Sequence, residues 1–395
     1  MPEKLQVAYL STYVPQECGI ATFTEDLLRG VGADRSQLPG WVLAMNDGTV
    51  EGGYPPEVVQ VVREDHPEDY LRVADWVNDG PVNLVSVQHE FGIYGGEDGS
   101  YLLEFLRRLK KPAVATLHTV LSRPTPGQHR LLRQVAAGCE MVVVMSRKAS
   151  VLLAEVYDVP RAKVAVVPHG VPPVPAYSRE EAKRAAGLAG RRVVLTFGLL
   201  SPGKGVEYML EALPPLVERH PDLVYLVAGH VHPKVRRRFG DGYRRTLEES
   251  VAHHHLERHV RFDPAYLDKE RLVRYLVAAD VIVTPYLSVE QIVSGALTYA
   301  VGFGRAVIST PFYYATDILA KGRGLLVGFG DSRALTLAVY RVLGEPGLKQ
   351  DMEERAARYG EQLGWPRVGA RYMRIFQRVA GPAPLAVPGS RGVAG

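Results

Sequence analysis

The chain has 395 residues, enough for two domains with separate hydrophobic cores. Its 46% hydrophobic and 23% charged residues exclude a disordered, collagen-like or coiled-coil chain. A net charge of +4 is too small for a protein that coats nucleic acid. Two cysteines, Cys18 and Cys139, cannot build a disulfide framework or a four-ligand zinc site. Because neither a signal segment nor a bilayer-spanning run is seen, we expect a cytoplasmic globular protein.

The first half of the chain alternates short apolar runs with helical patterns. It opens with the run Leu5–Ser11, and helix-like spacing follows over Ala21–Val31. Further β-rich runs are Val58–Val62, Leu84–Gln88, Ala113–His118, Met141–Ser146 and Val164–Pro168. Most of these runs are apolar on both faces, as in a parallel sheet that helices cover on both sides. They predict a doubly wound α/β domain.

A second α/β domain is expected after the proline-rich linker Pro168–Pro175. Its strand candidates are Val193–Phe197, Val224–Ala228, Val260–Phe262, Val281–Pro285, Ala306–Ser309 and Gly324–Val327. Helical spacing covers Val206–Arg219. We predict one Rossmann-like domain over 1–172, joined by a C-terminal helix at about 366–380, a second over 173–365, and a flexible tail over 381–395.

The clearest local signal is a glycine-rich loop, Phe197–Gly205, between a predicted strand and a predicted helix. Gly198 and Gly203 let main-chain N–H groups approach a phosphate, and Lys204 adds a positive charge. The loop does not match the P-loop pattern, so a tight turn with a solvated lysine is the alternative. Ligands bind open α/β sheets at the carboxyl ends of the strands, which predicts a site in the cleft between the two domains.

A second candidate loop leaves the strand at Pro285 and enters a helix through Ser294 and Gly295. Glu290 lies on this loop, where its carboxylate would accept hydrogen bonds from sugar hydroxyls. The free amides from Val293 onward would hold a phosphate. The alternative is that Glu290 caps the helix, a position that carboxylates favour.

In this order the two loops resemble the C-terminal half of glycosyltransferase family 4, retaining glycosyltransferases of GT-B fold. That family holds the donor diphosphate with Gly-Arg-Leu and Lys-Gly, and contacts the donor sugar and ribose with a Glu-x7-Glu motif. This chain has Gly198–Leu200, Lys204–Gly205, and Glu290 with Thr298. Leu199 and Thr298 therefore stand where the family usually has an arginine and the second glutamate. The resemblance implies that Lys204 and Glu290 act on the donor and that Thr298 lies at the ribose.

The N-terminal half resembles the same family. Glu17–Phe23 is similar to its first glycine loop, which implies a place for Gly19 at the donor phosphates and for Glu17 on the acceptor side. His118 ends a strand where the family has a histidine near the donor sugar hydroxyls. Val167–Val171 resembles the Pro-Asn-Gly-Val that closes the first domain, with His169 replacing asparagine. The resemblance covers nearly the whole chain.

Three other groups of polar residues have weaker patterns. His89 and Glu90 leave a strand and would grip acceptor hydroxyls, or belong to a loop without catalytic duty. The run His253–His255 points in different directions on a helix, so we predict a solvated surface rather than a metal site. Arg236–Arg238, with Arg244 and Arg245, is a solvated helix face or a peripheral membrane contact for a lipid-linked acceptor.

Together these features predict transfer of a hexosyl group from a nucleotide-diphospho-sugar to a carbohydrate or other hydroxyl acceptor, with retained anomeric configuration. We find no convincing Asp-x-Asp pair on a strand-end loop to hold a divalent ion, which agrees with the metal-independent chemistry that the resemblance implies. We therefore expect no metal, and no cofactor besides the nucleotide-sugar substrate. By family habit, UDP-glucose and GDP-mannose are the first donors to consider. The alternatives are a GT-B phosphorylase, a sugar-nucleotide epimerase or a catalytically weak glycan-binding partner. A nicotinamide-dependent dehydrogenase lacks support, because no strand is followed by Gly-x-Gly-x-x-Gly.

Overall fold

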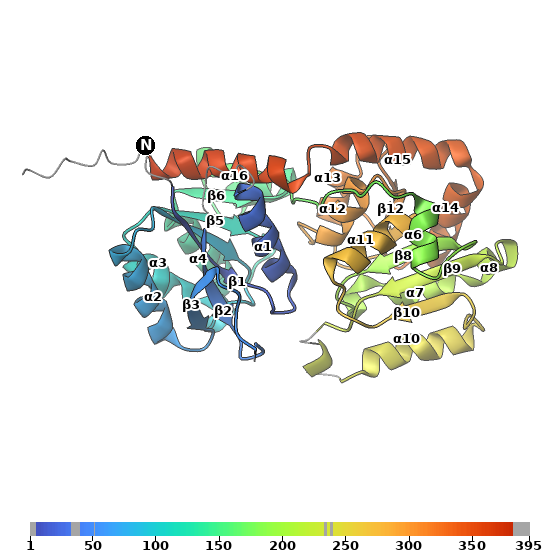
Figure 1. Ribbon diagram of the computed structural model, residues 1–395, viewed down its shortest axis with the longest axis horizontal. Coiled ribbons are helices and arrows are strands. Elements are labelled where there is room, and N and C mark those ends of the chain that lie inside the picture. The colour runs from blue at the N-terminus through green and yellow to red at the C-terminus, as the bar shows by residue number, and fades with distance from the viewer. Residues whose placement is uncertain (1–4, 33–39, 51, 233–234, 238–239, 382–395) are drawn as a thin grey trace, which may run out of the picture.

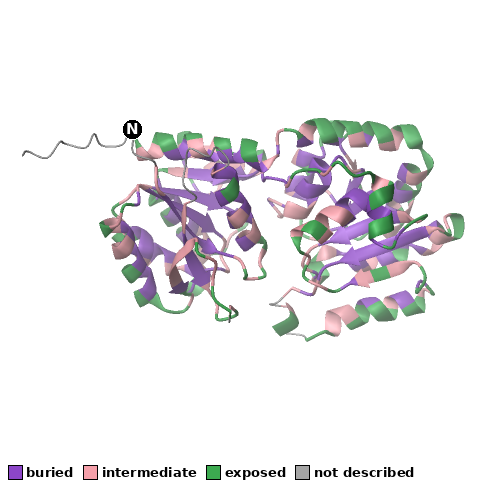
Figure 2. Ribbon diagram, viewed as in Figure 1, coloured by how far each residue is buried: buried purple, intermediate pink, exposed green. Residues whose placement is uncertain are grey.

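The computed structural model describes residues 5–32, 40–50, 52–232, 235–237 and 240–381, so most of the predicted tail lies outside the described residues. Two α/β domains lie side by side, and each contains a parallel sheet between layers of helices (Figure 1). The central strands are almost completely buried and the strands at the sheet edges only partly, whereas exposed residues concentrate on the outer faces of the helices (Figure 2). This burial on both faces explains why the strands have continuous apolar sequences.

The N-terminal sheet has seven parallel strands in the order β3-β2-β1-β4-β5-β6-β7. The strands are β1 (Val7–Thr12), β2 (Trp41–Asn46), β3 (Val58–Arg63), β4 (Leu84–His89), β5 (Ala113–Leu117), β6 (Met141–Val144) and β7 (Val164–Val166). The helices are α1 (Gly19–Val31), α2 (Pro67–Asp79), α3 (Leu102–Arg108), α4 (Pro126–Ala137) and α5 (Arg147–Glu155), with 3-10 turns η1 (Glu97–Gly99) and η2 (Arg161–Lys163). All predicted strands are confirmed, and β2 is additional.

The C-terminal sheet has six parallel strands in the order β10-β9-β8-β11-β12-β13. The strands are β8 (Arg192–Phe197), β9 (Leu223–Ala228), β10 (Val260–Asp263), β11 (Val281–Thr284), β12 (Val307–Ser309) and β13 (Leu325–Leu326). The helices are α6 (Arg179–Ala185), α7 (Val206–Ala212), α8 (Pro214–Arg219), α10 (Gly242–His253), α11 (Lys269–Ala278), α12 (Gly295–Gly302), α13 (Tyr313–Ile318), α14 (Ser332–Gly344) and α15 (Pro346–Gly360), with the 3-10 turn η3 (Pro202–Lys204). The single helix predicted over Val206–Arg219 is wrong in one respect: it divides before Pro214, which has no N–H for a helical hydrogen bond.

The last helix, α16 (Trp365–Ala380), returns from the C-terminal domain and packs across the N-terminal domain against α1 (Figure 1). Two glycines allow the close approach of these helices. A Cβ on Gly30 would lie 2.7 Å from the Trp365 carbonyl oxygen, and one on Gly369 would lie 2.1 Å from the Gly30 carbonyl carbon. Any larger side chain at either position would force α1 and α16 apart.

The strand order reverses beside β1 in one sheet and beside β8 in the other. At such a switch point the loops after neighbouring strands turn to opposite faces of the sheet, which opens a crevice at the carboxyl ends of the strands. The fold therefore places one crevice in each domain.

Candidate active site

A cleft of about 1050 Å³ lies between the two domains and is lined by loops from both. The N-terminal wall includes Thr12, Glu17, Gly19, Asp47, Thr49, Glu64, Glu90, His118 and Thr119. The C-terminal wall includes Leu199, His232, Arg237 and the segment 288–293 except Val289. A smaller hollow of about 200 Å³ shares Gly19 and Leu199 with this cleft and continues it between α1 and α12. The predicted location of the site between the domains is consistent with these walls.

His118 follows β5 and lines the cleft. Its Nε2 atom is 3.0 Å from Gln88 Oε1, and its ring meets the Phe23 ring edge to face at 4.8 Å between centroids. Burial lowers the pKa of His118 to about 3, helped by the nearby imidazoles of His169 and His89. The imidazole is therefore neutral near pH 7 and suits hydrogen bonding rather than a charge interaction.

Glu290 lies on the loop after β11 and reaches across the cleft. Its carboxylate accepts a hydrogen bond from Ser122 Oγ of the N-terminal domain, and the Tyr313 hydroxyl lies 3.5 Å from the same Ser122 oxygen. Glu290 does not cap α12, because Ser294 occupies that position and accepts a hydrogen bond from the Leu297 amide at 3.2 Å. The capping alternative for Glu290 is therefore wrong, and its carboxylate is part of the cleft wall.

Two helices begin at the cleft. No side chain caps α1, whose first residue is Gly19. Val293, just before α12, lines the large cleft, and Gly295 lines the small hollow. The Ser294 hydroxyl oxygen accepts the capping bond, and the residue is buried and lines neither hollow, so what this segment can offer a ligand is main-chain N–H groups. Such helix ends favour anions, which suits a diphosphate.

The glycine-rich loop after β8 packs against the loop after β11. Gly205 adopts a left-handed φ of 63°, and a Cβ there would lie 2.1 Å from the Pro285 carbonyl oxygen. The Leu287 amide donates to the Gly203 carbonyl at 3.0 Å. Lys204 Nζ lies 3.8 Å from the centre of the Tyr286 ring. Neither Gly203 nor Lys204 lines the two hollows, so their roles in binding the sugar donor stay predictions.

Gly198 and Leu199 do reach the site. Both line the small hollow, and Leu199 also lines the large cleft. Gly198 lies against Gly229, where a Cβ would meet the Gly198 carbonyl oxygen at 2.2 Å, so the ends of β8 and β9 touch through glycine. The position that the family usually fills with arginine is therefore an apolar part of the wall.

Thr298 is placed differently from the prediction. It is fully buried, and its hydroxyl lies 2.8 Å from the Ser294 carbonyl oxygen and 2.7 Å from the Tyr314 hydroxyl. It lines neither hollow. The Thr298 side chain is too short to reach either hollow from this buried position, so the geometry does not support the expected contact with the ribose.

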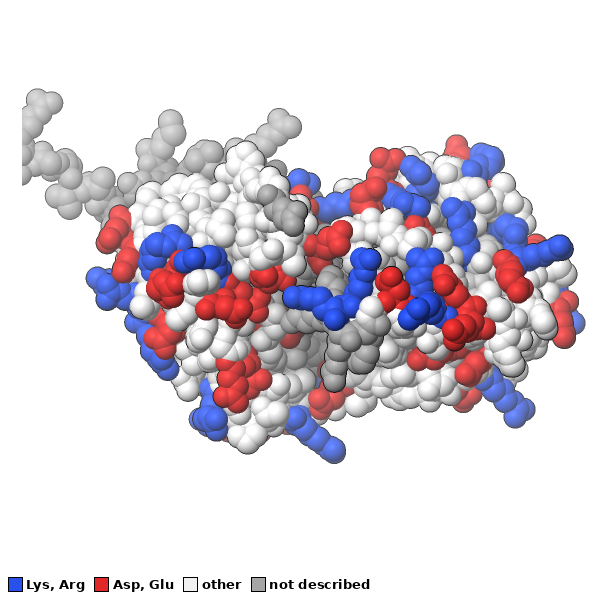
Figure 3. Space-filling view, turned by 90° about the horizontal axis from the view of Figure 1, so that it is seen from below, with Lys and Arg blue, Asp and Glu red and all other residues white. Residues whose placement is uncertain are grey.

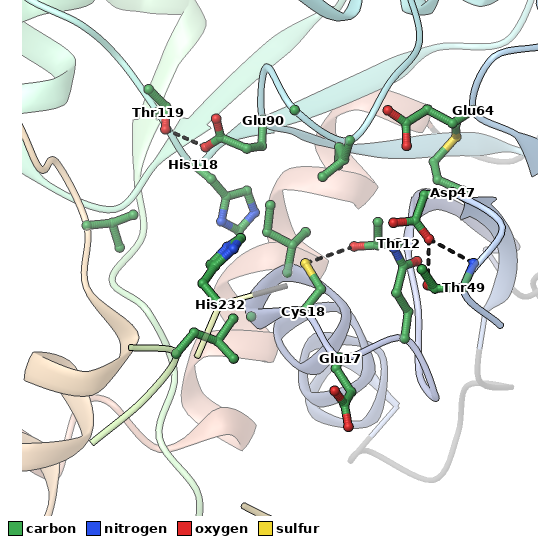
Figure 4. A pocket seen from close by; sticks show the side chains of 18 of the residues that line it. Thr12, Glu17, Cys18, Asp47, Thr49, Glu64, Glu90, His118, Thr119 and His232 are labelled. Carbon is green, nitrogen blue, oxygen red and sulfur yellow. Dashed lines mark hydrogen bonds between the residues drawn. The ribbon is translucent and has the colours of Figure 1, made fainter. Parts of the chain in front are cut away.

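The predicted acceptor residues divide into two groups. Glu17 lines the cleft with its carboxylate 3.6 Å from His230 Nε2. Glu90 also lines it, and Figure 4 shows this carboxylate accepting a hydrogen bond from Thr119. His89 does not line it: the ring is fully buried, and burial lowers its pKa to about 4. Successive residues of a strand point to opposite faces, so Gln88 reaches His118 while His89 turns toward Phe91 and Tyr94.

Several residues of the site are absent from the sequence predictions. Asp47 and Thr49 follow β2, a strand that those predictions do not include. Lys269, at the start of α11, pairs with Glu25 at 2.6 Å and with Asp26 at 2.5 Å across the domain boundary. Burial raises the pKa of Asp26, and the Lys269 ammonium opposes that shift. Only the fold could reveal these pairs, because about 240 residues separate their members in sequence.

Charged side chains of both signs gather at the domain boundary on the face seen from below (Figure 3). Between the two domains, Arg237 Nη2 lies 3.6 Å from Asp47 Oδ2. Among the described residues, no three histidine, cysteine, aspartate or glutamate side chains converge as a metal site would need. Within the same part of the chain, no helix combines the length and apolar character that crossing a bilayer requires.

Two family descriptions match the chain: Glycosyltransferase Family 4 over residues 49–175 and Glycosyl transferases group 1 over residues 178–359. A phosphatidyl-myo-inositol mannosyltransferase from Mycolicibacterium smegmatis is 25% identical over 80% of this chain and 76% of its own length. A D-inositol 3-phosphate glycosyltransferase from Corynebacterium urealyticum is 28% identical over 64% of this chain and 60% of its own length.

Solved structures show the same architecture. Anabaena HepE in complex with UDP has a TM-score of 0.73 at 15% identity, covering 95% of this chain and all of that one. WaaG, a glycosyltransferase involved in lipopolysaccharide biosynthesis, has a TM-score of 0.69 at 18% identity, covering 94% of this chain and 99% of that one. The two-domain architecture is thus the GT-B fold of glycosyltransferases. The chain belongs to glycosyltransferase family 4, the group 1 glycosyl transferases, which confirms the resemblance noted in the sequence.

Proposed function

We propose that the chain transfers a hexosyl group from a nucleotide-diphospho-sugar to a hydroxyl acceptor, with retention and without a metal ion. One observation carries the proposal: His118 and Glu290 line one cleft together with the first residue of α1 and with Val293, just before α12. Negative charge grows on the departing nucleoside diphosphate as the glycosidic bond breaks. Preorganised N–H donors stabilise such charge most when water is excluded, and closure of the two domains would exclude it.

The proposed roles follow from the groups in the walls. Main-chain N–H groups at Gly19 and at Val293 to Gly295 bind the diphosphate. Lys204 rests on the Tyr286 ring, an attraction of about 0.5–1 kcal/mol at exposed sites, and phosphate oxygens would draw the ammonium toward the donor. Glu290 orients donor hydroxyls, and Ser122 holds its carboxylate in place. The leaving phosphate then takes the acceptor proton.

The small hollow is the proposed place for the nucleoside. Tyr266 and Leu267, just after β10, line it and offer apolar surface to a base and ribose. HepE has been crystallised with UDP and with UDP-glucose, which supports a uridine donor as the first to try, with GDP-mannose second.

The acceptor is proposed to be an uncharged polyhydroxyl compound. The N-terminal wall presents Glu17, Asp47, Glu64 and Glu90, and none of the described N-terminal residues that line the cleft is lysine or arginine. Carboxylates accept hydrogen bonds from hydroxyls and repel phosphate. The two relatives described above are named for inositol-containing acceptors, so free myo-inositol and an inositol phosphate form an informative pair.

The test begins with a thermal-shift screen of nucleoside diphosphates and their sugars, since a ligand at about 100 times its Kd stabilises by about 2.7 kcal/mol. The best donor is then incubated with candidate acceptors. We expect nucleoside diphosphate to be released only when an acceptor is added, unchanged by EDTA, and the product to keep the donor's anomeric configuration by NMR. Formation of a sugar phosphate when inorganic phosphate is supplied would indicate a phosphorylase. Conversion of the donor sugar into its epimer would indicate an epimerase. Binding of glycan without turnover would indicate a binding partner.

A further inference from the structure

Gln88 and His118 lie side by side at the carboxyl ends of β4 and β5. Gln88 is fully buried, and its Oε1 atom is 3.0 Å from His118 Nε2. The Gln88 amide nitrogen donates to Ser86 Oγ at 3.3 Å on the same strand. In this arrangement the amide atom that faces His118 is Oε1, and an amide oxygen only accepts hydrogen bonds.

His118 must therefore donate through Nε2. A neutral imidazole carries one ring proton, so Nδ1 is left as an acceptor. We infer that Gln88 is a positioning residue, which fixes the His118 proton on Nε2 so that Nδ1 accepts a hydrogen bond from a hydroxyl of the donor sugar. The inference rests on the proposed function, because that function brings the sugar to His118. The two other imidazoles near His118, those of His89 and His169, each have a pKa lowered to about 4 by burial and stay neutral with it.

The rest of the surroundings fixes the ring plane. The Phe23 ring meets the imidazole edge to face at an interplanar angle of 88°, and the His118 amide donates to the His89 carbonyl at 2.9 Å. An Nδ1 acceptor rejects phosphate and carboxylate oxygens, which have no hydrogen to donate. The site thus requires a hydroxyl on the sugar carbon that meets His118, and this requirement is a specificity determinant.

NMR of the intact protein labelled with 15N-histidine tests the tautomer directly, with His118→Asn to assign the ring. We expect Nε2 protonated and Nδ1 unprotonated in the unchanged chain, the same in Gln88→Glu, which keeps an acceptor, and a mixture or the other tautomer in Gln88→Leu. Protonated Nδ1 in the unchanged chain, or an unchanged tautomer in Gln88→Leu, overturns the inference. This measurement needs no turnover, so its result stands even if the transferase assay fails.

Kinetics test whether Gln88 acts through His118. Gln88→Leu is expected to lower kcat about tenfold, the effect of one misplaced hydrogen bond, with little change in donor KM. In a His118→Ala background the same change should cost nothing further, because coupled residues are not additive. An undiminished loss there contradicts a positioning role. Gln60→Leu is the matched control, since Gln60 lies on β3 of the same sheet, bonded to Arg72, and does not line the cleft.

Deoxyfluoro donors complete the test, because fluorine replaces a hydroxyl without a hydrogen to donate. At one ring position, replacing the hydroxyl by fluorine should slow transfer by the wild-type protein. The same replacement should not slow transfer by His118→Ala any further. If no position behaves so while turnover of the natural donor is normal, Nδ1 does not accept from the sugar and the inference fails alone.

Discussion

The two walls of the cleft are built from similar sheets but offer different chemistry. The N-terminal wall presents side chains on short turns, among them Glu17, Asp47 and Glu90. The C-terminal wall presents glycine backbone after β8 and β9, the main-chain segment that leads into α12 and, among the described lining residues, one carboxylate, Glu290. Under the proposed function, the side chains of the N-terminal wall discriminate hydroxyl patterns of the acceptor, whereas backbone amides of the C-terminal wall bind the diphosphate that all donors share. We therefore expect side-chain substitutions in the N-terminal wall to change which acceptor is used. Donor binding should instead depend on the backbone geometry of the C-terminal loops.

The largest expected effect is at Glu290, where the C-terminal wall relies on a side chain. Glu290→Ala should lower kcat about 10²–10³-fold, the range for loss of one preorganised group at the reacting centre. Initial rates of nucleoside diphosphate release measure it. Glu361→Ala, an exposed change at the end of α15, serves as the control. Unchanged turnover in Glu290→Ala would remove Glu290 from the mechanism.

The next largest effect is expected from a methyl group added at Gly205, which should lower both stability and donor binding. Gly205→Ala would place Cβ 2.1 Å from the Pro285 carbonyl oxygen and separate the two donor loops. Gly190→Ala has a similar left-handed φ, 71° against 63°, but meets nothing within 4 Å. We expect Gly205→Ala to be less stable than this control by roughly 1–3 kcal/mol in urea unfolding, and to bind the donor more weakly. Equal stabilities would show that the loop contact is dispensable.

Lys204 tests how much a charged side chain adds to the backbone of the C-terminal wall. Lys204→Met keeps the apolar stem over Tyr286 and removes the ammonium. We expect donor Kd to rise about tenfold by calorimetry, while Lys110→Met, far from the cleft, leaves it unchanged. A donor Kd within twofold of the original would mean that main-chain N–H groups bind the diphosphate alone.

The sequence predicted the sheets better than the site. Buried parallel strands are continuous apolar runs, so almost every strand could be read locally. β2 was missed although Trp41–Met45 is such a run, and with it the position of Asp47. Linear patterns also placed His118 and Glu290 at strand ends, where they line the cleft. They could not show that Thr298 turns toward Tyr314, because that depends on how α12 packs.

The smallest expected effect concerns Asp69, which holds the segment next to Glu64 of the N-terminal wall in place. Asp69 on α2 accepts hydrogen bonds from the Arg63 amide at 3.0 Å and from Arg63 Nε at 2.8 Å. Arg63 directly precedes Glu64, which lines the cleft. These bonds lower the Asp69 pKa to about 2. A carboxylate with a depressed pKa stabilises the fold above its unfolded pKa of about 3.9, and that contribution is lost as pH falls toward 2.

Asp69→Asn should therefore destabilise the chain by about 1–2 kcal/mol at pH 7, with the difference shrinking as the pH falls below 4. Urea unfolding at several pH values measures it, and Asp75→Asn, in an exposed pair with Arg108, is the control that should cost under about 1 kcal/mol. If the two walls act separately, Asp69→Asn raises the acceptor KM and leaves donor affinity unchanged. A change in donor affinity instead would mean that the walls are mechanically coupled, and the division between side-chain and backbone recognition would no longer hold.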